Sequence, residues 1–250
     1  GSSAVAFERF QFDRAKQRAM TKSGSGDLDL VSCTFVSNGF STAGAGMGVY
    51  AGKAVAFSGT GALLVTNCYF AYNYQTNNAT GTGGPGAALA VNSGRARVVD
   101  SRFFANCLMF VVPQNGNSSA TLFNTWPKGS AIYAAGKVCV ERCDFRANLC
   151  NTRGSEQSGQ NGGVVFFASG SSGSAVSNCI FAGNVDRASW NSPLSARTGA
   201  IVLELGAKAR TVDVFGSTFA YNLADTSAGS AGITVVAGTA NVKNCVFTGN

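Results

Sequence analysis

The chain has 250 residues, of which 32 are glycine and only 12% are charged. This composition argues against stacked amphipathic helices, which need long polar faces and few glycines. The 19 lysines and arginines outnumber the 12 acidic residues, and the resulting net charge of +7 favours acidic partners. The chain has no histidine and no Cys-x-x-Cys pair, so a zinc site is not expected.

The N-terminal part precedes any clear repeat. Residues 1–7 read as a strand that opens a repeat unit, and residues 13–21 are expected to form a short helix in the first loop. A Phe-x-x-Asn motif then recurs seven times, at spacings from 28 residues (Phe219 to Phe247) to 42 residues (Phe103 to Phe145). A strict motif with a loose period indicates a fixed structural unit that carries loops of different lengths.

The seven copies define the candidate structural columns. The phenylalanines are Phe35, Phe70, Phe103, Phe145, Phe181, Phe219 and Phe247. The asparagines are Asn38, Asn73, Asn106, Asn148, Asn184, Asn222 and Asn250. Two residues before each phenylalanine stands a small residue, namely Cys33, Cys68, Ser101, Cys143, Cys179, Ser217 or Cys245.

The flanking positions indicate strands with one buried face. Five residues before each phenylalanine the residue is Leu30 or a valine, whereas the residue directly before it varies freely. Tolerance that alternates with a period of two is typical of half-buried strands. Each copy also opens with a strand of small residues, as in 129–135 and 162–168, and more weakly in 46–50 and 86–91. Each unit thus has room for about three short strands.

The fold predicted from these patterns is all-β. We expect a right-handed parallel β-helix of about seven coils, with the handedness taken from the general rule for parallel crossovers. Residues 1–250 form a single segment, whose units end near the seven motif asparagines, and this segment is expected to be a window of a longer array. A propeller would need about four antiparallel strands in each unit.

Stacked coils turn equivalent residues into ladders. The phenylalanines are expected to stack, and the asparagines to bridge backbone groups at the corners of successive coils. The cysteines of the ladder are expected to stay unbridged, as small hydrophobic residues, because strands about 4.8 Å apart exceed the preferred Cβ separation of a disulfide. Cys107 and Cys150 follow the corner asparagine in adjacent units and are the candidate disulfide.

The pairing of a Gly-Gly-Ala-Ile-like strand with Phe-x-x-Asn resembles the repeats of the polymorphic outer membrane proteins, which are bacterial surface adhesins of the autotransporter type. It is also similar to related pectin-lyase-like β-helix proteins. The resemblance covers all seven units and implies adhesion or display at a cell surface. Asn78 and Asn117 begin glycosylation sequons in expected loops, which also favours an extracellular location.

A carbohydrate-active enzyme is the rival interpretation, since such chemistry needs two or three converging carboxylates. Asp186 and Asp225 lie five and six residues beyond the phenylalanine in adjacent units and are a weak candidate for a calcium or sugar site. Solvated loop charges are the preferred interpretation of both. Asp100 with Arg142, and Arg102 with Asp144, are expected to form opposite-charge pairs on the outer face. No catalytic residue and no cofactor is assigned.

The expected function is therefore structural or adhesive: a non-enzymatic extracellular or cell-surface β-helix that acts as a rigid spacer or as a subunit of a surface filament. The alternative is a pectin-lyase-like protein that binds or cleaves polysaccharides. Expected partners are other copies or other surface proteins, through end strands and the loops 75–83 and 108–128, and acidic glycans. Neither nucleic-acid binding nor a transmembrane segment is expected. A basic outer patch is predicted from Arg95, Arg97, Arg102, Arg142 and Arg146.

Overall fold

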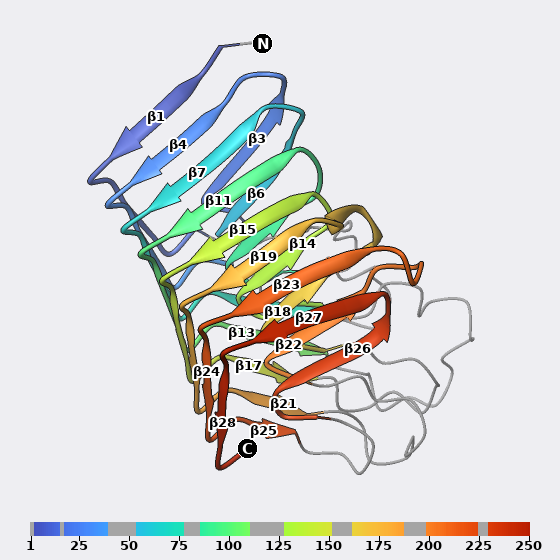
Figure 1. The fold of residues 1–250 in the computed structure, drawn as a ribbon. Helices are drawn as coiled ribbons and strands as arrows, with labels where there is room; N and C mark the ends of the chain where they lie inside the picture. Colours follow the sequence, from blue (N-terminus) through green and yellow to red (C-terminus); the bar gives the residue numbers. More distant parts are fainter. Residues whose placement is uncertain are drawn as a thin grey trace, which may run out of the picture.

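The computed structural model describes residues 3–15, 18–39, 54–77, 86–110, 128–151, 162–187, 199–224 and 230–250. These residues form a right-handed parallel β-helix in which strands of successive coils lie side by side (Figure 1). The strands belong to four sheets, called A to D here, and neighbouring strands within each sheet are parallel. The predicted fold class is thus confirmed.

Sheets A and B contain eight strands each. Sheet A consists of β1 (Val5–Glu8), β4 (Leu28–Val31), β7 (Ala62–Thr66), β11 (Arg95–Val99), β15 (Lys137–Glu141), β19 (Ser174–Ser177), β23 (Thr211–Phe215) and β27 (Thr239–Lys243). Sheet B consists of β2 (Gln11–Asp13), β5 (Thr34–Val36), β8 (Tyr69–Ala71), β12 (Arg102–Phe104), β16 (Asp144–Arg146), β20 (Ile180–Ala182), β24 (Thr218–Ala220) and β28 (Val246–Thr248).

Sheets C and D are smaller. Sheet C consists of β3 (Met20–Gly24), β6 (Val55–Gly59), β10 (Leu89–Val91), β14 (Ile132–Ala134), β18 (Val165–Phe167), β22 (Ile201–Glu204) and β26 (Ile233–Ala237). Sheet D consists of β9 (Tyr74–Asn77), β13 (Cys107–Phe110), β17 (Leu149–Asn151), β21 (Val185–Arg187) and β25 (Leu223–Ala224). A 3₁₀ turn, η2 (Ser169–Ser171), joins β18 to β19.

A complete coil therefore has four strands, in the order C, A, B and D, where about three were predicted. The additional strand belongs to sheet D and follows the corner asparagine directly, at a place where the sequence predicted a loop. The sequence signal for this strand is short, because only two residues alternate in burial, as with the half-buried Tyr74 and the buried Gln75. So brief an alternation cannot be distinguished from the start of a loop.

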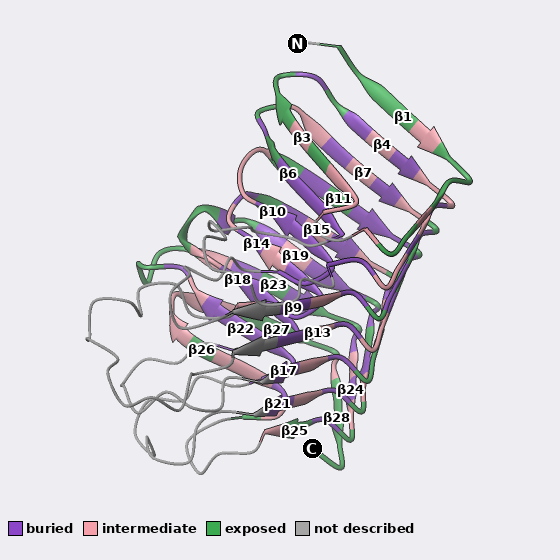
Figure 2. Cartoon of the chain, turned by 180° about the vertical axis from the view of Figure 1, so that it is seen from behind, coloured by how far each residue is buried: buried purple, intermediate pink, exposed green. Residues whose placement is uncertain are grey.

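The core fills the interior of the coils. Figure 2 shows buried residues along the middle of the stack and exposed residues on the first and last strands. The register places equivalent residues directly opposite one another, for example Val65 opposite Val98 in sheet A and Phe70 opposite Phe103 in sheet B. This alignment gives the core its columns, and each inward side chain packs on its own equivalent in the next coil.

Two corners in each coil are made by single residues in the left-handed region. One lies between sheets A and B, where Asp100 has φ 50° and Arg142 has φ 49°. The other precedes the corner asparagine, where Ala105 has φ 49° and Ala147 has φ 53°. Non-glycine residues adopt this conformation at a cost of about 1 kcal/mol or more. The first of these corners lies directly before the cysteine column, and glycine seldom marks it.

The N-terminal coil differs from its prediction. Of residues 1–7, Val5, Ala6 and Phe7 belong to strand β1, which is not an opening strand but lies in sheet A, with Phe7 opposite Leu30. The described part of residues 13–21 contains no helix, because Asp13 ends β2 and Met20 begins β3. Phe12 lies opposite Phe35, so the stack has eight coils where about seven were predicted.

The opening strands are those of sheet C. The segments 86–91, 129–135 and 162–168 contain β10, β14 and β18, as predicted. Residues 46–50 lie outside the described residues, and the sheet C strand of that coil is β6. At the other end of the stack, β26, β27 and β28 border a hollow of about 470 Å³ into which the last coil presents its apolar side chains, with Phe247 49% exposed.

Candidate functional site

The phenylalanine column forms one continuous stack. Rings of neighbouring coils have centroids 4.6 to 4.9 Å apart and planes within 9° of parallel. The members are Phe12, Phe35, Phe70, Phe103, Phe145, Phe181, Phe219 and Phe247. The spacing equals that of neighbouring strands, so the stack follows directly from the register. This column is structural, since the rings between Phe35 and Phe219 are fully buried.

The corner asparagines form a hydrogen-bonded ladder beside the rings. Asn148 is typical: its Oδ1 accepts from the backbone N–H and from Nδ2 of Asn106, at 3.0 Å each. Its Nδ2 donates to the carbonyl of Phe103 and to Oδ1 of Asn184. The same pattern connects Asn38, Asn73, Asn106, Asn148, Asn184, Asn222 and Asn250.

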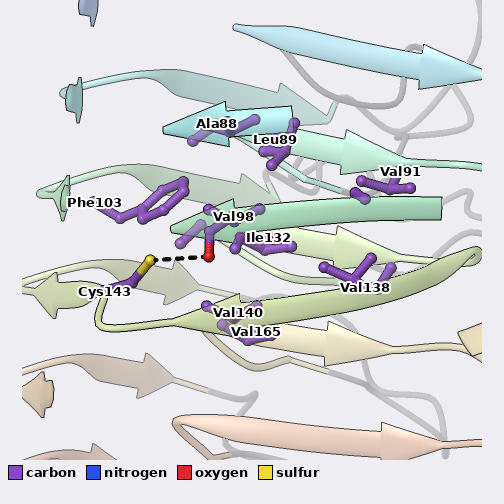
Figure 3. Close-up of a cluster of buried hydrophobic side chains, with 14 of the residues drawn as sticks. Ala88, Leu89, Val91, Val98, Phe103, Ile132, Val138, Val140, Cys143 and Val165 are labelled. Atoms are coloured by element: carbon purple, nitrogen blue, oxygen red, sulfur yellow. Dashed lines mark hydrogen bonds between the residues drawn. The ribbon is translucent and has the colours of Figure 1, made fainter. Parts of the chain in front are cut away.

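The ladder cysteines take part in hydrogen bonds as well as in packing. Cys143 donates its backbone N–H to Sγ of Cys179 at 3.4 Å, and its thiol donates to the carbonyl of Val98 (Figure 3). Ser101 fills the same role with Oγ, which accepts from the backbone N–H of Cys68 at 3.1 Å. The interpretation of these thiols as small hydrophobic residues was therefore incomplete. Cys33, Cys68, Cys143, Cys179 and Cys245 are all free.

Cys107 and Cys150 do not form the predicted disulfide, and both are free. The register pairs Cys107 with Leu149 and Leu108 with Cys150, so the two cysteines are offset by one residue. An offset of one residue puts two side chains on opposite faces of a sheet. Cys150 packs with Ala87 and Leu108 in a small buried cluster, and Cys107 is half-buried.

The outer face of sheets A and B carries a network of ion pairs. Arg142 binds Asp100 through two hydrogen bonds of 2.7 and 2.9 Å, as predicted. Arg97 likewise donates two hydrogen bonds to the carboxylate of Glu141, of 3.2 and 2.9 Å. The hydrogen bonds from these guanidinium groups lower the pKa of Asp100 and of Glu141. Much of the predicted basic patch is therefore neutralised.

The second predicted pair on this face is wrong. Arg102 and Asp144 are opposite each other in the register, but Asp144 binds Arg146 of its own strand, with Nε 2.8 Å from both carboxylate oxygens. Residues two apart in a strand share a face, so Arg146 competes directly with the residue across the strand gap. Arg102 is exposed and forms no ion pair with any residue that the structure describes.

A shallow hollow of about 270 Å³ lies beside Arg102 on the outer face of sheet B. Tyr69, Arg102, Phe103, Phe104, Asp144 and Arg146 line it, from β8, β12 and β16. Tyr69 is 37% exposed, and the ring of Phe104 meets that of Tyr72 edge to face at 5.6 Å. Aromatic surface and a guanidinium group thus meet on one accessible face, which makes this hollow the candidate functional site.

Asp186 is buried and is not a solvated loop charge. It is the second residue of β21 on the buried face, and its Oδ2 accepts from the backbone N–H groups of Gly163 at 2.6 Å and Gly199 at 3.0 Å. Burial raises the pKa of this carboxyl to about 7, against the lowering effect of these hydrogen bonds. Its predicted partner Asp225 lies outside the described residues. Within the described ranges, no group of three or more acidic or cysteine side chains is placed to hold a metal ion.

Several other predicted contact residues cannot be placed. The sequon residues Asn78 and Asn117 lie outside the described part of the chain, as do most of the predicted contact loops. Gln75 and Leu108, where those loops were expected to begin, are buried residues of sheet D. The described chain contains no helix with the length and apolar character needed to span a bilayer.

One further cluster on the outside of sheet C was not predicted. Lys128 Nζ lies 2.6 Å from Glu204 and 4.8 Å from the centre of the Phe166 ring. Phe166 in turn stacks on Tyr133 at 6.0 Å. These residues belong to three coils, and the residue type at the equivalent positions differs from coil to coil. No repeated pattern in the sequence therefore predicted the cluster. Since Phe166 is fully buried, the cluster fastens coils together and does not present an open site.

Comparisons of the chain with protein-family models, curated proteins and solved structures find no match.

Proposed function

We propose that this protein is a non-enzymatic β-helix that works outside the cell or at its surface, as a rigid spacer or an adhesion subunit. The observation that carries the proposal is the unbroken stack of eight phenylalanine rings with its asparagine ladder. A column without a gap gives every coil the same fixed distance from its neighbour.

The mechanism is mechanical. Seven steps of about 4.8 Å give the ring stack a rise of about 34 Å. Bending the rod would have to open parallel strand pairs, ring contacts and asparagine bonds together. Because each coil contacts only its neighbours, every added coil repeats the same set of contacts along the axis, as in other solenoids. Such a body can hold surface groups at a set height and in a set order.

Two features of the sequence support a place at a surface. The repeats resemble those of the polymorphic outer membrane proteins, and two glycosylation sequons begin at Asn78 and Asn117. The sheet D strands of successive coils are each followed by a long stretch of sequence before the next strand of sheet C, and these strands end on the same side of the rod. Variable loops on a rigid scaffold are a common way to build contact surfaces.

The test combines shape with activity on the purified chain. Small-angle scattering is expected to show an elongated rigid particle, and incubation with neutral and acidic polysaccharides is expected to leave their length unchanged. Adhesion is measured with chain-coated beads on glycan-coated and cell surfaces. Time-dependent cleavage of a polysaccharide would overturn the proposal in favour of a carbohydrate-active enzyme. A flexible particle would overturn the role as a rigid spacer.

A further inference from the structure

We infer that the hollow beside Arg102 binds a short segment of an acidic polysaccharide, through a carboxylate or sulfate group of the sugar. This inference rests on the proposed adhesive function and gives it a ligand class and a place on the rod. The supporting observations are the unpaired guanidinium, the aromatic surface beside it and the length of the hollow along the axis.

The charge at the hollow favours an anion. Three neighbouring arginines have carboxylate partners, since Arg97 binds Glu141, Arg142 binds Asp100 and Arg146 binds Asp144. Arg102 differs from these three, because no carboxylate of the described residues forms an ion pair with it.

Asp144 is next to Arg102 in the register, but Arg146 already occupies both of its oxygens. The acidic group at the hollow is thus neutralised, and the guanidinium of Arg102 remains available. Its planar fork of donors matches the two oxygens of a carboxylate or a sulfate.

The aromatic residues favour a sugar over a simple ion. Tyr69 lies directly opposite Arg102 in the register and keeps 37% of its surface exposed. The ring of Phe104 packs edge to face against that of Tyr72 and adds apolar surface to the hollow. Apolar ring surface next to a few polar groups is the usual lining of a small-molecule site, and a sugar ring offers both an apolar face and hydroxyl groups.

The length of the hollow favours a polymer segment. Its lining comes from β8, β12 and β16, which are three successive strands of sheet B. At about 4.8 Å for each step, the hollow extends about 10 Å along the rod. Because the hollow is shallow and opens on the outer face, it leaves room for a chain longer than itself.

The experiment measures binding of defined oligosaccharides to the whole chain by titration calorimetry. The probes are an oligogalacturonate, a heparin-derived oligosaccharide and a neutral cello-oligosaccharide, and vesicles with and without phosphatidylserine form a separate arm. We expect binding of one or both acidic oligosaccharides, weaker at high salt. The oligogalacturonate carries carboxylates only, whereas the heparin-derived oligosaccharide carries sulfates as well, so binding of the heparin probe alone would indicate recognition of sulfate. Absence of binding to both, equal binding of the neutral probe, or binding to acidic vesicles alone would overturn the inference.

Matched variants locate the site. Arg102→Gln is expected to weaken binding about tenfold or more, since hydrogen bonds to charged groups contribute about 1.5–3 kcal/mol. Arg95→Gln removes the same charge from an exposed position on β11 outside the hollow and is expected to change affinity little. Equal losses in both variants would show attraction by net charge only and would overturn the assigned site.

A second pair of variants tests the aromatic contact. Tyr69→Ala is expected to weaken binding severalfold, whereas Tyr221→Ala, at a tyrosine that is 71% exposed on a distant coil, is expected to leave it unchanged. Unchanged affinity in Tyr69→Ala would contradict the stacking role. If glycan binding fails while scattering still shows a rigid particle without cleavage activity, only this inference fails and the proposed function stands.

Discussion

At the scale of single residues, the corner asparagine has the largest hydrogen-bonding role in the coil. The side chain of Asn148 makes four hydrogen bonds, two to the preceding asparagine, one to the carbonyl of Phe103 and one to the following asparagine. All of these groups are buried, so water cannot replace a missing partner.

Asn148→Ala is therefore expected to destabilise the fold by about 2–4 kcal/mol, because it removes the acceptor of two buried N–H donors of Asn106 and one donor to the buried carbonyl of Phe103. Urea unfolding monitored by circular dichroism measures the change. Asn241→Ala is the control, since Asn241 is exposed and bonds only Asp213 among its described neighbours. A loss in the control as large as that in Asn148→Ala would contradict the role of the ladder.

Asp186 gives the fold a pH dependence. Its pKa is raised from 3.8 to about 7 by burial, so the folded state binds the proton more tightly than the unfolded state. Stability from this group is therefore greatest below about pH 4 and falls as pH rises to about 7, by up to about 4 kcal/mol. Asp186→Asn is expected to flatten this dependence. The measurement is the urea midpoint at several pH values between 4 and 8, and an unchanged slope in the variant would contradict the assignment.

At the scale of elements, the phenylalanine of each sheet B strand fixes the spacing of the coils. Phe145 stacks between Phe103 at 4.9 Å and Phe181 at 4.6 Å and is fully buried. The strands of sheet B that contain these rings have only three residues each. A strand of three residues forms few backbone hydrogen bonds to its neighbours. Packing between the rings therefore contributes much of its contact with the next coil.

Phe145→Ala is expected to cost about 3–5 kcal/mol, through lost apolar burial and the cavity left in the column. The expected cost of Phe215→Ala is about 1 kcal/mol or less, because this residue of β23 points outward and is 43% exposed. Unfolding free energies of the two variants make the comparison. Similar costs would show that the stack is not the principal contact between neighbouring coils.

The columns could be predicted because they repeat. Phenylalanine and asparagine recur at a fixed offset, so seven weak signals support one another, and the parallel stack follows. Phe12 was not recognised as a member of the phenylalanine column, because Ala15 stands where the motif asparagine is expected. The backbone N–H of Ala15 still donates to Asn38. The first coil thus contains the stacked phenylalanine ring but has alanine in place of the corner asparagine.

The candidate site was only partly predictable from the sequence. Its features depend on which of two arginines binds Asp144 and on where the short strands of sheet D begin and end. Arg102 was expected to pair with Asp144, and the loss of that pair depends on Arg146 two residues farther along the strand. Asp186 was assigned to a loop because nothing in the sequence marks the short sheet D. Its burial and its two amide partners follow from that strand.

At the scale of the whole molecule, both ends of the rod expose apolar side chains. At the first coil, Phe7 meets Phe10 and Phe12 edge to face, at 5.5 and 5.9 Å, while Phe10 remains 53% exposed. At the last coil, Phe247 is 49% exposed and Val235 is 44% exposed, and both border the terminal hollow. The second end thus presents apolar surface and the unpaired edges of its strands.

We expect this 250-residue chain to self-associate through that end as concentration rises. Sedimentation velocity measures the effect, and Phe247→Lys is expected to weaken it by placing a charge in the apolar contact. Tyr72→Lys adds the same charge to a side position that is 55% exposed in an earlier coil and serves as the control. Sedimentation as a monomer at all concentrations, or equal weakening by both variants, would contradict this prediction.

The asparagine ladder also gives the rod a dipole along its axis. Every amide in the row points its oxygen toward the first coil and a hydrogen toward the last, so the small dipoles add instead of cancelling. Aligned amides polarise one another, and the bonds in the middle of a row gain the most from this mutual effect. Lengthening the row by whole coils would therefore strengthen bonds that already exist, so that the benefit of each added coil is shared by its predecessors.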